Sequence, residues 1–280
     1  MRRPFPTGAA GVDLFFVISG FIMAGNAKGK TPGRFLSDRF WRIYPLWWIA
    51  VLPWMLWTEP RWERLAASVT LWPIYSSWQV PDLRVGWTLS FEMLFYCAMG
   101  LAIRLGAMPL LALYGIMLAA AFLTHWPLFY YLGNPMILEF LAGVLIAQAP
   151  KEAKLTLPLL GLALIVLAFS PARVGDGEMT LRLAAVWRVL WWGIPAALIV
   201  YACVSAEAAF QSHAWRFPLL LGNASYSIDL FHPAFMDLPV PWPIRFVVAV
   251  AAGVIVYWFI ERRLLMMRRG RPPVTATVPD

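Results

Sequence analysis

The stretch "GVDLFFVISGFIMAGN", residues 11–26, decides the class of fold to which this chain belongs. It is almost wholly apolar and approaches the length of about 20 residues that a helix needs to span a bilayer. One charged residue, Asp13, stands inside it. A carboxylate facing lipid is costly, so acids within spanning helices face a partner or a cavity and are candidate functional residues. The stretch therefore predicts a membrane helix that presents a polar group to the protein interior.

The composition of the whole chain agrees with a membrane protein. Of its 280 residues 61% are hydrophobic and only 14% are charged, whereas a soluble domain has about 25% charged residues. The net charge of +8 arises from short basic clusters between apolar runs, a pattern typical of membrane topology. We therefore predict no nucleic-acid partner. The two cysteines lie inside apolar runs, so the sequence predicts neither a disulfide framework nor a metal site.

Nine apolar runs are long enough to be candidate spanning helices. They cover residues 9–25, 41–58, 86–103, 107–124, 128–149, 155–171, 184–204, 217–236 and 243–261. The sequence thus predicts an all-α, polytopic membrane helix bundle that contacts the lipid bilayer. The longest connection, 59–84, is predicted to lie at the membrane interface and to hold a short helix at 62–71.

The basic residues predict the orientation of these helices. Cytoplasmic loops carry an excess of Lys and Arg, and the segment 28–42 after the first run is strongly basic. Alternation through nine helices then places most basic residues, and the C-terminus, in the cytoplasm. The N-terminus would lie outside although it begins Met-Arg-Arg. We therefore expect one further span ahead of Met1.

Five ionisable residues in the runs are functional candidates, namely Asp13, Glu92, Glu139, Asp229 and His232. In "VGWTLSFEMLFY", 85–96, Thr88, Glu92 and Tyr96 are spaced i, i+4, i+8 and share one helix face. Glu92 is either a proton-handling or substrate-binding carboxylate, or a tether between helices. Arg188, in the seventh run, is expected to reach outward from its helix.

The segment "LGNASYSIDLFHP", 221–233, is the most polar of the predicted spans. Ser225, Asp229 and His232 share a helix face, but residues seven apart stand two turns apart on a straight helix. A catalytic relay needs hydrogen-bond contact between its members. We therefore interpret the three as a stripe that lines a cavity, with Pro233 kinking or ending the helix.

The segment "RFLSDRFWRIYPLWW", 34–48, places Arg39 and Arg42 on one side of a helix, with Arg34 a turn earlier. The positive-inside rule and an aromatic belt explain such residues without a ligand. An anion site is the other interpretation, because a guanidinium donates two coplanar hydrogen bonds to a phosphate.

These stretches, with "NPMILEFLAGVLIA" at 134–147 and "YWFIERRLL" at 257–265, together resemble the acyltransferase 3 family of bacterial membrane acyltransferases. The resemblance is nearest to the family's branch that O-acetylates exopolysaccharides and O-antigens. It implies a ten-helix domain in the bacterial inner membrane, here at 1–267, followed by a basic, disordered cytoplasmic tail at 268–280. It also implies transfer of an acyl group, usually acetyl, from cytoplasmic acyl-CoA to a hydroxyl of an exported or cell-surface polysaccharide or its lipid-linked precursor. Acyl-CoA is then a co-substrate, with no permanently bound cofactor, and proteins of polysaccharide biosynthesis are possible partners.

The resemblance also implies roles for individual residues. Glu92, Asp13 and His232 are the catalytic candidates, as base, orienting charge and oxyanion donor or pocket residue. The candidates for acyl-CoA binding are Arg34, Arg39 and Arg42, and those for the acceptor are Trp87, Tyr96, Ser225 and Tyr226. The family's first helix carries a catalytic His, which residues 1–10 do not contain, so we expect it upstream. Asp229 stands where the family often has Tyr.

Other functions remain open from the sequence. A transporter or flippase for a glycan or lipid precursor would also need carboxylates within its spans, although such folds often show internal repeats and none is evident here. An inactive acyltransferase lacking its first helix and a scaffolding membrane subunit are further alternatives.

Overall fold

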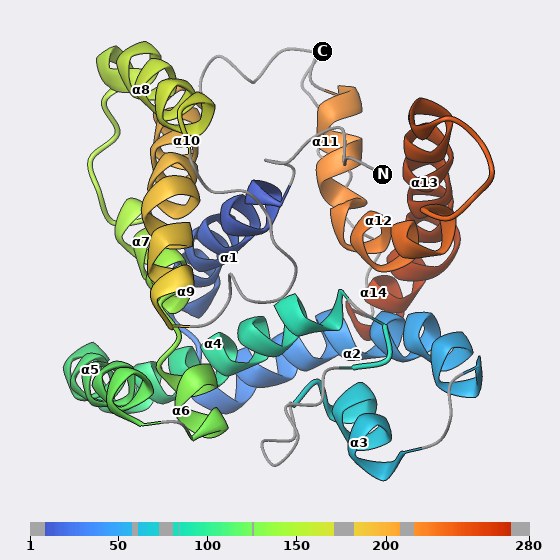
Figure 1. The fold of residues 1–280 in the computed structure, drawn as a ribbon, viewed down its shortest axis with the longest axis horizontal. Helices are drawn as coiled ribbons and strands as arrows, with labels where there is room; N and C mark the ends of the chain where they lie inside the picture. The colour runs from blue at the N-terminus through green and yellow to red at the C-terminus, as the bar shows by residue number, and fades with distance from the viewer. Residues whose placement is uncertain are drawn as a thin grey trace. The chain divides into compact units, whose positions relative to one another are not determined.

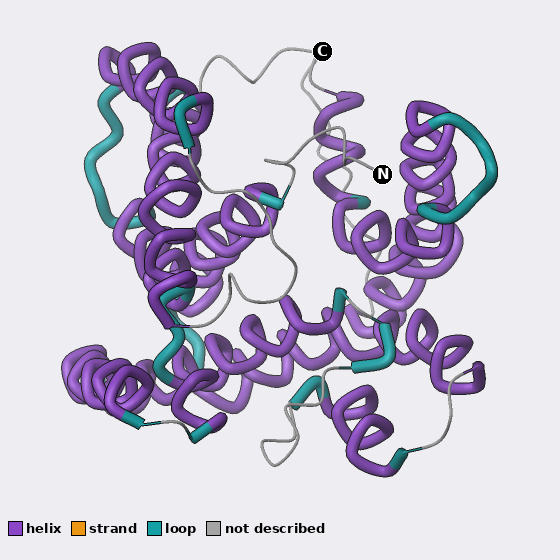
Figure 2. Tube along the Cα trace, viewed as in Figure 1, coloured by secondary structure: helices purple, strands orange, loops and turns teal. Residues whose placement is uncertain are grey.

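The computed structural model describes residues 9–57, 61–72, 81–83, 85–124, 126–170, 182–207 and 216–269, and every regular element within these ranges is helical (Figures 1 and 2). The predicted all-α class is therefore confirmed. The described residues divide into two compact units. The first contains 9–36, 88–124, 126–170 and 182–207, and the second contains 37–57, 61–72, 81–83, 85–87 and 216–269.

The helices follow the predicted apolar runs closely. The first unit holds α1 (Ala10–Ala27), most of α4 (Gly86–Leu105), α5 (Ala107–Leu123), α6 (Pro127–Leu132), α7 (Ile137–Ile146), α8 (Thr156–Ala168) with the preceding 3-10 turn η1 (Ala153–Leu155), α9 (Arg182–Arg188), and α10 (Ile194–Ser205). The second holds most of α2 (Pro32–Trp57), α3 (Trp62–Thr70), α11 (Arg216–Asn223), α12 (Ser225–Phe231), the 3-10 turn η6 (His232–Phe235), α13 (Trp242–Val256) and α14 (Arg262–Arg269). The predicted short helix at 62–71 is confirmed by α3. Of the predicted tail, residues 270–280 lie outside the described part.

Within the described residues, five helical stretches are long and apolar enough to cross a membrane, which identifies a multi-pass membrane protein. They are Ala10–Ala27, Gly86–Leu105, Pro127–Ile146, Leu183–Ser205 and Trp242–Met267. Two shorter apolar helices, Ala107–Leu123 and Ala153–Ala168, match two further predicted runs. The count of nine spans stays a prediction.

Three predicted spans have a different form in the structure, and the run 128–149 is one of them, because it is divided into α6 and α7. The run 41–58 belongs to a longer helix, α2, which begins at Pro32 and includes the charged segment before the run. The run 217–236 is divided into α11, α12 and the 3-10 turn η6. The division at His232 follows from Pro233, which has no N–H to donate to the preceding helical turn. The predicted helix end beside Pro233 is therefore confirmed.

The centre of the first unit is a close crossing of α1 and α7. A Cβ atom on Gly20 would overlap the carbonyl oxygen of Phe140, and one on Gly143 would overlap that of Val17. Small residues at such crossings let two helix backbones touch, which gives the dispersion contacts that hold helices together in a membrane. Phe16 stacks on Phe140 beside the crossing, with ring centroids 4.5 Å apart.

Two π-helical turns interrupt the long helices. The turn η3 (Val189–Gly193) joins α9 to α10, and η7 (Tyr257–Glu261) joins α13 to α14. A π turn inserts one residue and changes which side chains face the interior, and such turns are frequent at functional sites. Arg188 immediately precedes η3 and Glu261 ends η7. Both residues are buried charges.

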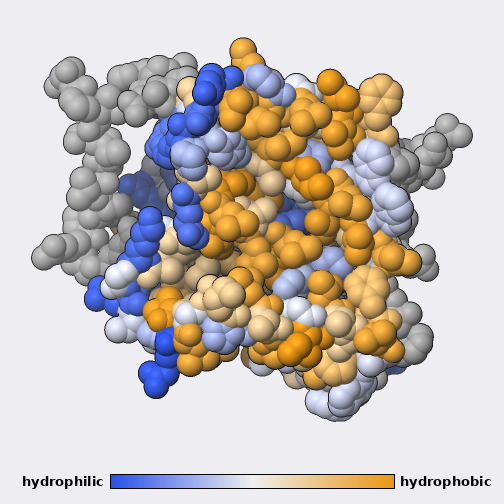
Figure 3. All heavy atoms as spheres, turned by 90° about the vertical axis from the view of Figure 1, so that its left-hand side faces the viewer, coloured by the Kyte–Doolittle hydropathy of each residue, from blue (hydrophilic) through white to orange (hydrophobic). Residues whose placement is uncertain are grey.

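The surface has broad apolar areas, one of which fills much of the face shown in Figure 3. Exposed large side chains on α5 and α8 include Leu113, Ile116, Leu157 and Leu164. Contiguous apolar patches of this kind are rare on soluble monomers. Lipid is the environment that suits them.

Candidate functional site

Glu92 lies in the first unit, on α4, and is buried. Its Oε1 accepts a hydrogen bond from Ser19 Oγ of α1 at 2.8 Å and another from the hydroxyl of Tyr96. Tyr96 is one turn along α4, as the predicted spacing requires, and its ring meets that of Phe35 edge-on. Thr88 is also buried on this helix. Two hydroxyl donors thus fix the orientation of a buried carboxylate. Of these two donors, the sequence placed only Tyr96 on the same helix face as Glu92.

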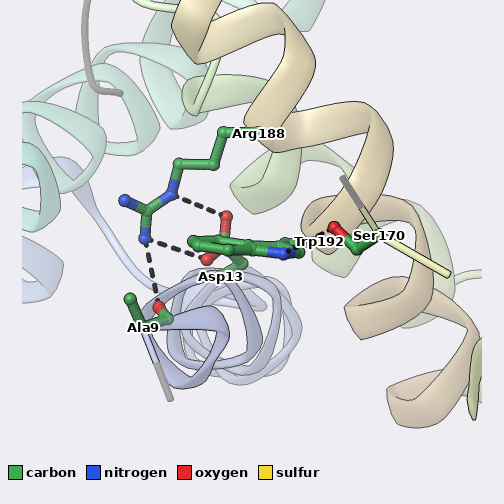
Figure 4. A network of polar contacts seen from close by, with 5 residues as sticks. All are labelled: Ala9, Asp13, Ser170, Arg188 and Trp192. Atoms are coloured by element: carbon green, nitrogen blue, oxygen red, sulfur yellow. Dashed lines mark hydrogen bonds and ion pairs between the residues drawn. The ribbon is translucent and has the colours of Figure 1, made fainter. Parts of the chain in front are cut away.

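Asp13 is paired with Arg188 in the same unit (Figure 4). Arg188 Nε donates to Asp13 Oδ1 at 3.0 Å, and Nη2 donates to Oδ2 at 2.9 Å and to the carbonyl of Ala9 at 3.2 Å. The exposed fractions of Asp13 and Arg188 are 0% and 4%. The expectation that Arg188 reaches outward is wrong. It turns inward because a bidentate contact with a carboxylate compensates both buried charges.

An aromatic side chain completes this contact. The guanidinium carbon of Arg188 lies 5.3 Å from the ring centroid of Trp192, within the range of a cation–π interaction. Trp192 Nε1 in turn donates to Ser170 Oγ at 3.2 Å (Figure 4). The π turn η3 contains Trp192 and directly follows Arg188, so one local distortion positions both residues.

Glu139, on α7, is a third charged residue at the same place. Its exposed fraction is 2%, and no hydrogen-bond donor among the described residues reaches either carboxyl oxygen. Oε1 lies 2.7 Å from the position that a Cβ atom on Gly193 would occupy, so only glycine leaves room for it. The carboxyl groups of Glu139 and Asp13 are within hydrogen-bonding reach of each other. The sequence named Glu139 as a candidate but gave it no partner.

A second polar network lies in the second unit. Arg42 of α2 forms an ion pair with Glu261, and Ser227 Oγ donates to the other oxygen of that carboxylate. The guanidinium carbon of Arg42 lies 5.6 Å from the ring centroid of Tyr226, whose hydroxyl donates to the carbonyl of Ile43 at 2.8 Å. The structure therefore brings together the predicted residues Arg42 and Tyr226. Glu261 and Ser227 were missed, because neither stands out in its run.

The remaining predicted residues are distributed over both units. Arg34 is exposed in the first turn of α2, and Arg39 is half-buried on the same helix. Ser225 is exposed, whereas Asp229 and His232 are half-buried, with His232 Nδ1 lying 2.8 Å from the carbonyl oxygen of Asp229. Trp87 is half-buried at the start of α4.

A hollow of about 410 Å³ opens where α1 and α7 end. It is lined by Phe21, Ile22, Gly25, Asn26, Lys28, Ile146, Ala147 and Lys151. Lys151 also pairs with Glu207 at 2.6 Å. The sequence gave no indication of this hollow.

The similarity of this chain to known proteins shows which family it belongs to. A family model described as an acyltransferase domain matches residues 3–262. This chain belongs to the acyltransferase 3 family. It is 33% identical, over 308 aligned residues, to the exopolysaccharide production protein ExoZ of Rhizobium meliloti (strain 1021), covering 95% of this chain and 92% of that protein. It is also 51% identical over 47 residues to protein 2 in the picA locus of Rhizobium radiobacter, covering 14% of this chain and 24% of that protein. No solved structure matches the chain.

The contacts around Glu92 and the network around Arg42 both fall within the matched residues 3–262. In the first unit the network offers a carboxylate oriented by hydroxyl donors, which is the geometry that a general base requires. In the second it offers a guanidinium held by a carboxylate, which is the geometry that presents an arginine to an anion.

Proposed function

We propose that this acyltransferase moves an acetyl group from cytoplasmic acyl-CoA to a hydroxyl of an exported or cell-surface polysaccharide, or of its lipid-linked precursor. The reaction would take place in the bacterial inner membrane, with the C-terminus of the chain in the cytoplasm. The observation that carries the proposal is the buried Glu92, held by Ser19 and Tyr96 inside a membrane span. The similarity to a protein of exopolysaccharide production supports a polysaccharide as the acceptor.

In this proposal Glu92 is the general base. Its carboxylate takes the proton from the acceptor hydroxyl while the hydroxyl oxygen attacks the thioester carbonyl carbon. Collapse of the tetrahedral intermediate breaks the C–S bond, and the proton passes to the departing thiolate, so the products are an O-acetyl ester and the CoA thiol. The hydrogen bonds from Ser19 and Tyr96 keep the carboxylate in one orientation, which lowers the entropic cost of reaching the transition state.

The arginines of α2 are proposed to bind the phosphates of acyl-CoA. Arg42 is suited to this role because Glu261 orients its guanidinium while 30% of its side chain stays accessible. Arg34 and Arg39 add positive charge on the same helix. Asp13 is assigned a positioning role, because its ion pair with Arg188 joins two candidate spans, Ala10–Ala27 and Leu183–Ser205.

The acceptor is proposed to contact the remaining candidates. Ser225 is the first residue of α12 and His232 is the first residue of η6. Trp87 lies at the start of α4. Indole and imidazole rings pack well against sugar faces because they are flat and carry a polar edge. The hydroxyls of Tyr96 and Tyr226 already donate hydrogen bonds within the protein. Any contribution of these residues to acceptor binding therefore comes from the ring.

To test this function, membranes from cells that produce the protein are incubated with acetyl-CoA that carries a label in its acetyl group. We expect label in the polysaccharide or lipid-linked sugar fraction as an ester that mild alkali removes. Glu92→Gln should abolish this labelling, whereas Glu152→Gln should not, because Glu152 is a half-buried residue outside the helices that pairs with Lys154. Absence of labelled ester with the wild-type protein, or equal labelling with Glu92→Gln, would contradict the proposal.

A further inference from the structure

Two carboxyl groups and one guanidinium are enclosed together in the first unit. Asp13 comes from α1, Glu139 from α7 and Arg188 from the end of α9, and the exposed fraction of each is 4% or less. The two helices that carry the acids, α1 and α7, touch backbone to backbone at Gly20 and Gly143. Because that crossing is backbone on backbone, the acids have little freedom to separate.

The charges at this place do not balance when both acids are ionised. Arg188 supplies one positive charge and gives its hydrogen bonds from Nε and Nη2 to Asp13 and Ala9. Glu139 receives no hydrogen bond from any donor in the described residues. An ionised carboxylate without a donor, in a membrane span and out of contact with water, is strongly unfavourable. The geometry therefore requires another source of compensation for Glu139.

A proton supplies that compensation. Two ionised carboxylates repel each other, but a neutral acid next to a carboxylate donates a short, strong O–H···O hydrogen bond to it. The carboxyl groups of Asp13 and Glu139 are within hydrogen-bonding reach. One proton between them gives Glu139 a partner, adds a third donor to Asp13 and makes the cluster neutral.

We propose that Asp13 and Glu139 share one proton at neutral pH, with Glu139 as a positioning residue that donates it to the Asp13 carboxylate. The cluster is then a neutral unit of one guanidinium, one carboxylate and one carboxylic acid. The proton stays bound to the folded protein, so sharing it consumes no water, metal ion or external base. The effect on catalysis rests on the proposed function, whereas the protonation itself does not.

The elements packed around Glu139 contribute few other charged groups. Among the described residues of α1, α7, η3 and α10, Asp13 and Glu139 are the only charged ones, and Arg188 directly precedes η3. The stacked rings of Phe95 and Phe140 bring α4 to the same region, where Glu92 is held by Ser19 and Tyr96. Removal of the shared proton would leave one uncompensated negative charge in this environment.

Infrared spectroscopy of the purified full-length chain tests the shared proton directly. We expect the carbonyl stretch of a protonated carboxyl group at neutral pH, and we expect Glu139→Gln to remove that band. The amide in Glu139→Gln keeps the size of the side chain and still donates to Asp13, so the variant should keep at least half of the wild-type acetyl-transfer rate and a similar melting temperature. Glu139→Ala should lower both the acetyl-transfer rate and the melting temperature. Wild-type protein with isotope-labelled glutamate carboxyl groups gives a second measurement, because a shift of the band assigns it to a glutamate and not to an aspartate.

The pH profile gives a readout that a merely structural residue would not change. Wild-type activity should fall at alkaline pH as the shared proton is lost, and this fall should be absent in Glu139→Gln. A protein without the protonated carboxyl band, or Glu139→Gln that is as unstable as a variant lacking Arg188, would overturn the proposal, since Glu139 would then be an ionised partner of Arg188. Failure of the wild-type protein to transfer acetyl groups would contradict the proposed function and leave the infrared result unaffected.

Discussion

Arg188 binds both carboxylate oxygens of Asp13, at 3.0 and 2.9 Å, although the two residues are 175 positions apart in the chain. The pair joins α1 to α9 and leaves neither charge exposed. In a membrane span such a pair is permissible because the geometry is bidentate and a third hydrogen bond goes to Ala9. The acid that marked the opening segment of the sequence thus has a defined partner.

Replacing Arg188 by leucine should destabilise the protein strongly. It leaves Asp13 buried without a positive partner, and breaking a buried pair in this way costs about 3–5 kcal/mol. The melting temperature of the detergent-purified protein measures the effect. The double variant Asp13→Leu with Arg188→Leu should regain most of the loss, because no unpaired charge remains. A single variant as stable as the wild type would show that the pair does not form.

The sequence predicted the elements of this fold more completely than their contacts. Apolar runs place nearly every helix, and the spacing of Glu92 and Tyr96 predicts their contact because both lie on one helix face. Ser19 is 73 positions from Glu92, and Glu261 is 219 positions from Arg42, so no local period connects them. The two π turns add a further difficulty, since the inserted residue changes the face on which Arg188 and Glu261 lie.

Adding a methyl group at the crossing of α1 and α7 should destabilise the first unit. Gly20→Ala and Gly143→Ala each place a Cβ atom into a backbone carbonyl of the other helix, and forced separation of packed helices costs about 1–3 kcal/mol. Gly25→Ala is the matched control on α1, because a Cβ atom there meets nothing within 4 Å. Thermal unfolding of the three variants should separate the first two from the third. Equal melting temperatures for all three would contradict the close crossing.

The donors to Glu92 should matter for rate. Ser19→Ala and Tyr96→Phe each remove one hydrogen bond to a carboxylate, worth about 1.5–3 kcal/mol, so each should lower kcat about tenfold or more. Glu92→Gln should lower it by about 10²- to 10⁴-fold. Tyr114→Phe serves as control, because the Tyr114 hydroxyl donates to the carbonyl of Asn134 away from Glu92. A Tyr96→Phe enzyme with unchanged kcat would show that the carboxylate needs no such orientation.

Arg42 should affect the binding of acyl-CoA rather than the chemical step. Arg42→Ala should raise KM for acetyl-CoA about tenfold, because one charge-assisted contact to a phosphate is lost. Glu261→Gln should raise KM less, since it leaves the guanidinium in place without its orienting charge. Arg64→Lys is the control, because Arg64 pairs with Asp82 and is assigned no ligand. A rise in KM confined to the polysaccharide acceptor would contradict this assignment.

The ion pair of Lys151 and Glu207 should contribute little to stability, in contrast to the buried pair. The ammonium of Lys151 lowers the pKa of Glu207 below its ordinary value. A lowered pKa in the folded state means that any stabilisation is present at neutral pH and is lost on acidification through that pKa. Both side chains are exposed and screened by salt, so Glu207→Gln should leave the melting temperature at pH 7 unchanged. A clear drop would show that the pair is shielded from water.

Glu92 is proposed to act as the general base when this membrane protein transfers acetyl groups to a polysaccharide. The most direct measurement is the O-acetyl content of the polysaccharide purified from a strain in which the gene has been deleted and then replaced by the wild-type or the Glu92→Gln gene. We expect deletion to remove O-acetyl groups, the wild-type gene to restore them, and the Glu92→Gln gene, with its product at equal levels in the membrane, to leave them absent. An O-acetyl content that is unchanged by the deletion, or fully restored by Glu92→Gln, would contradict it.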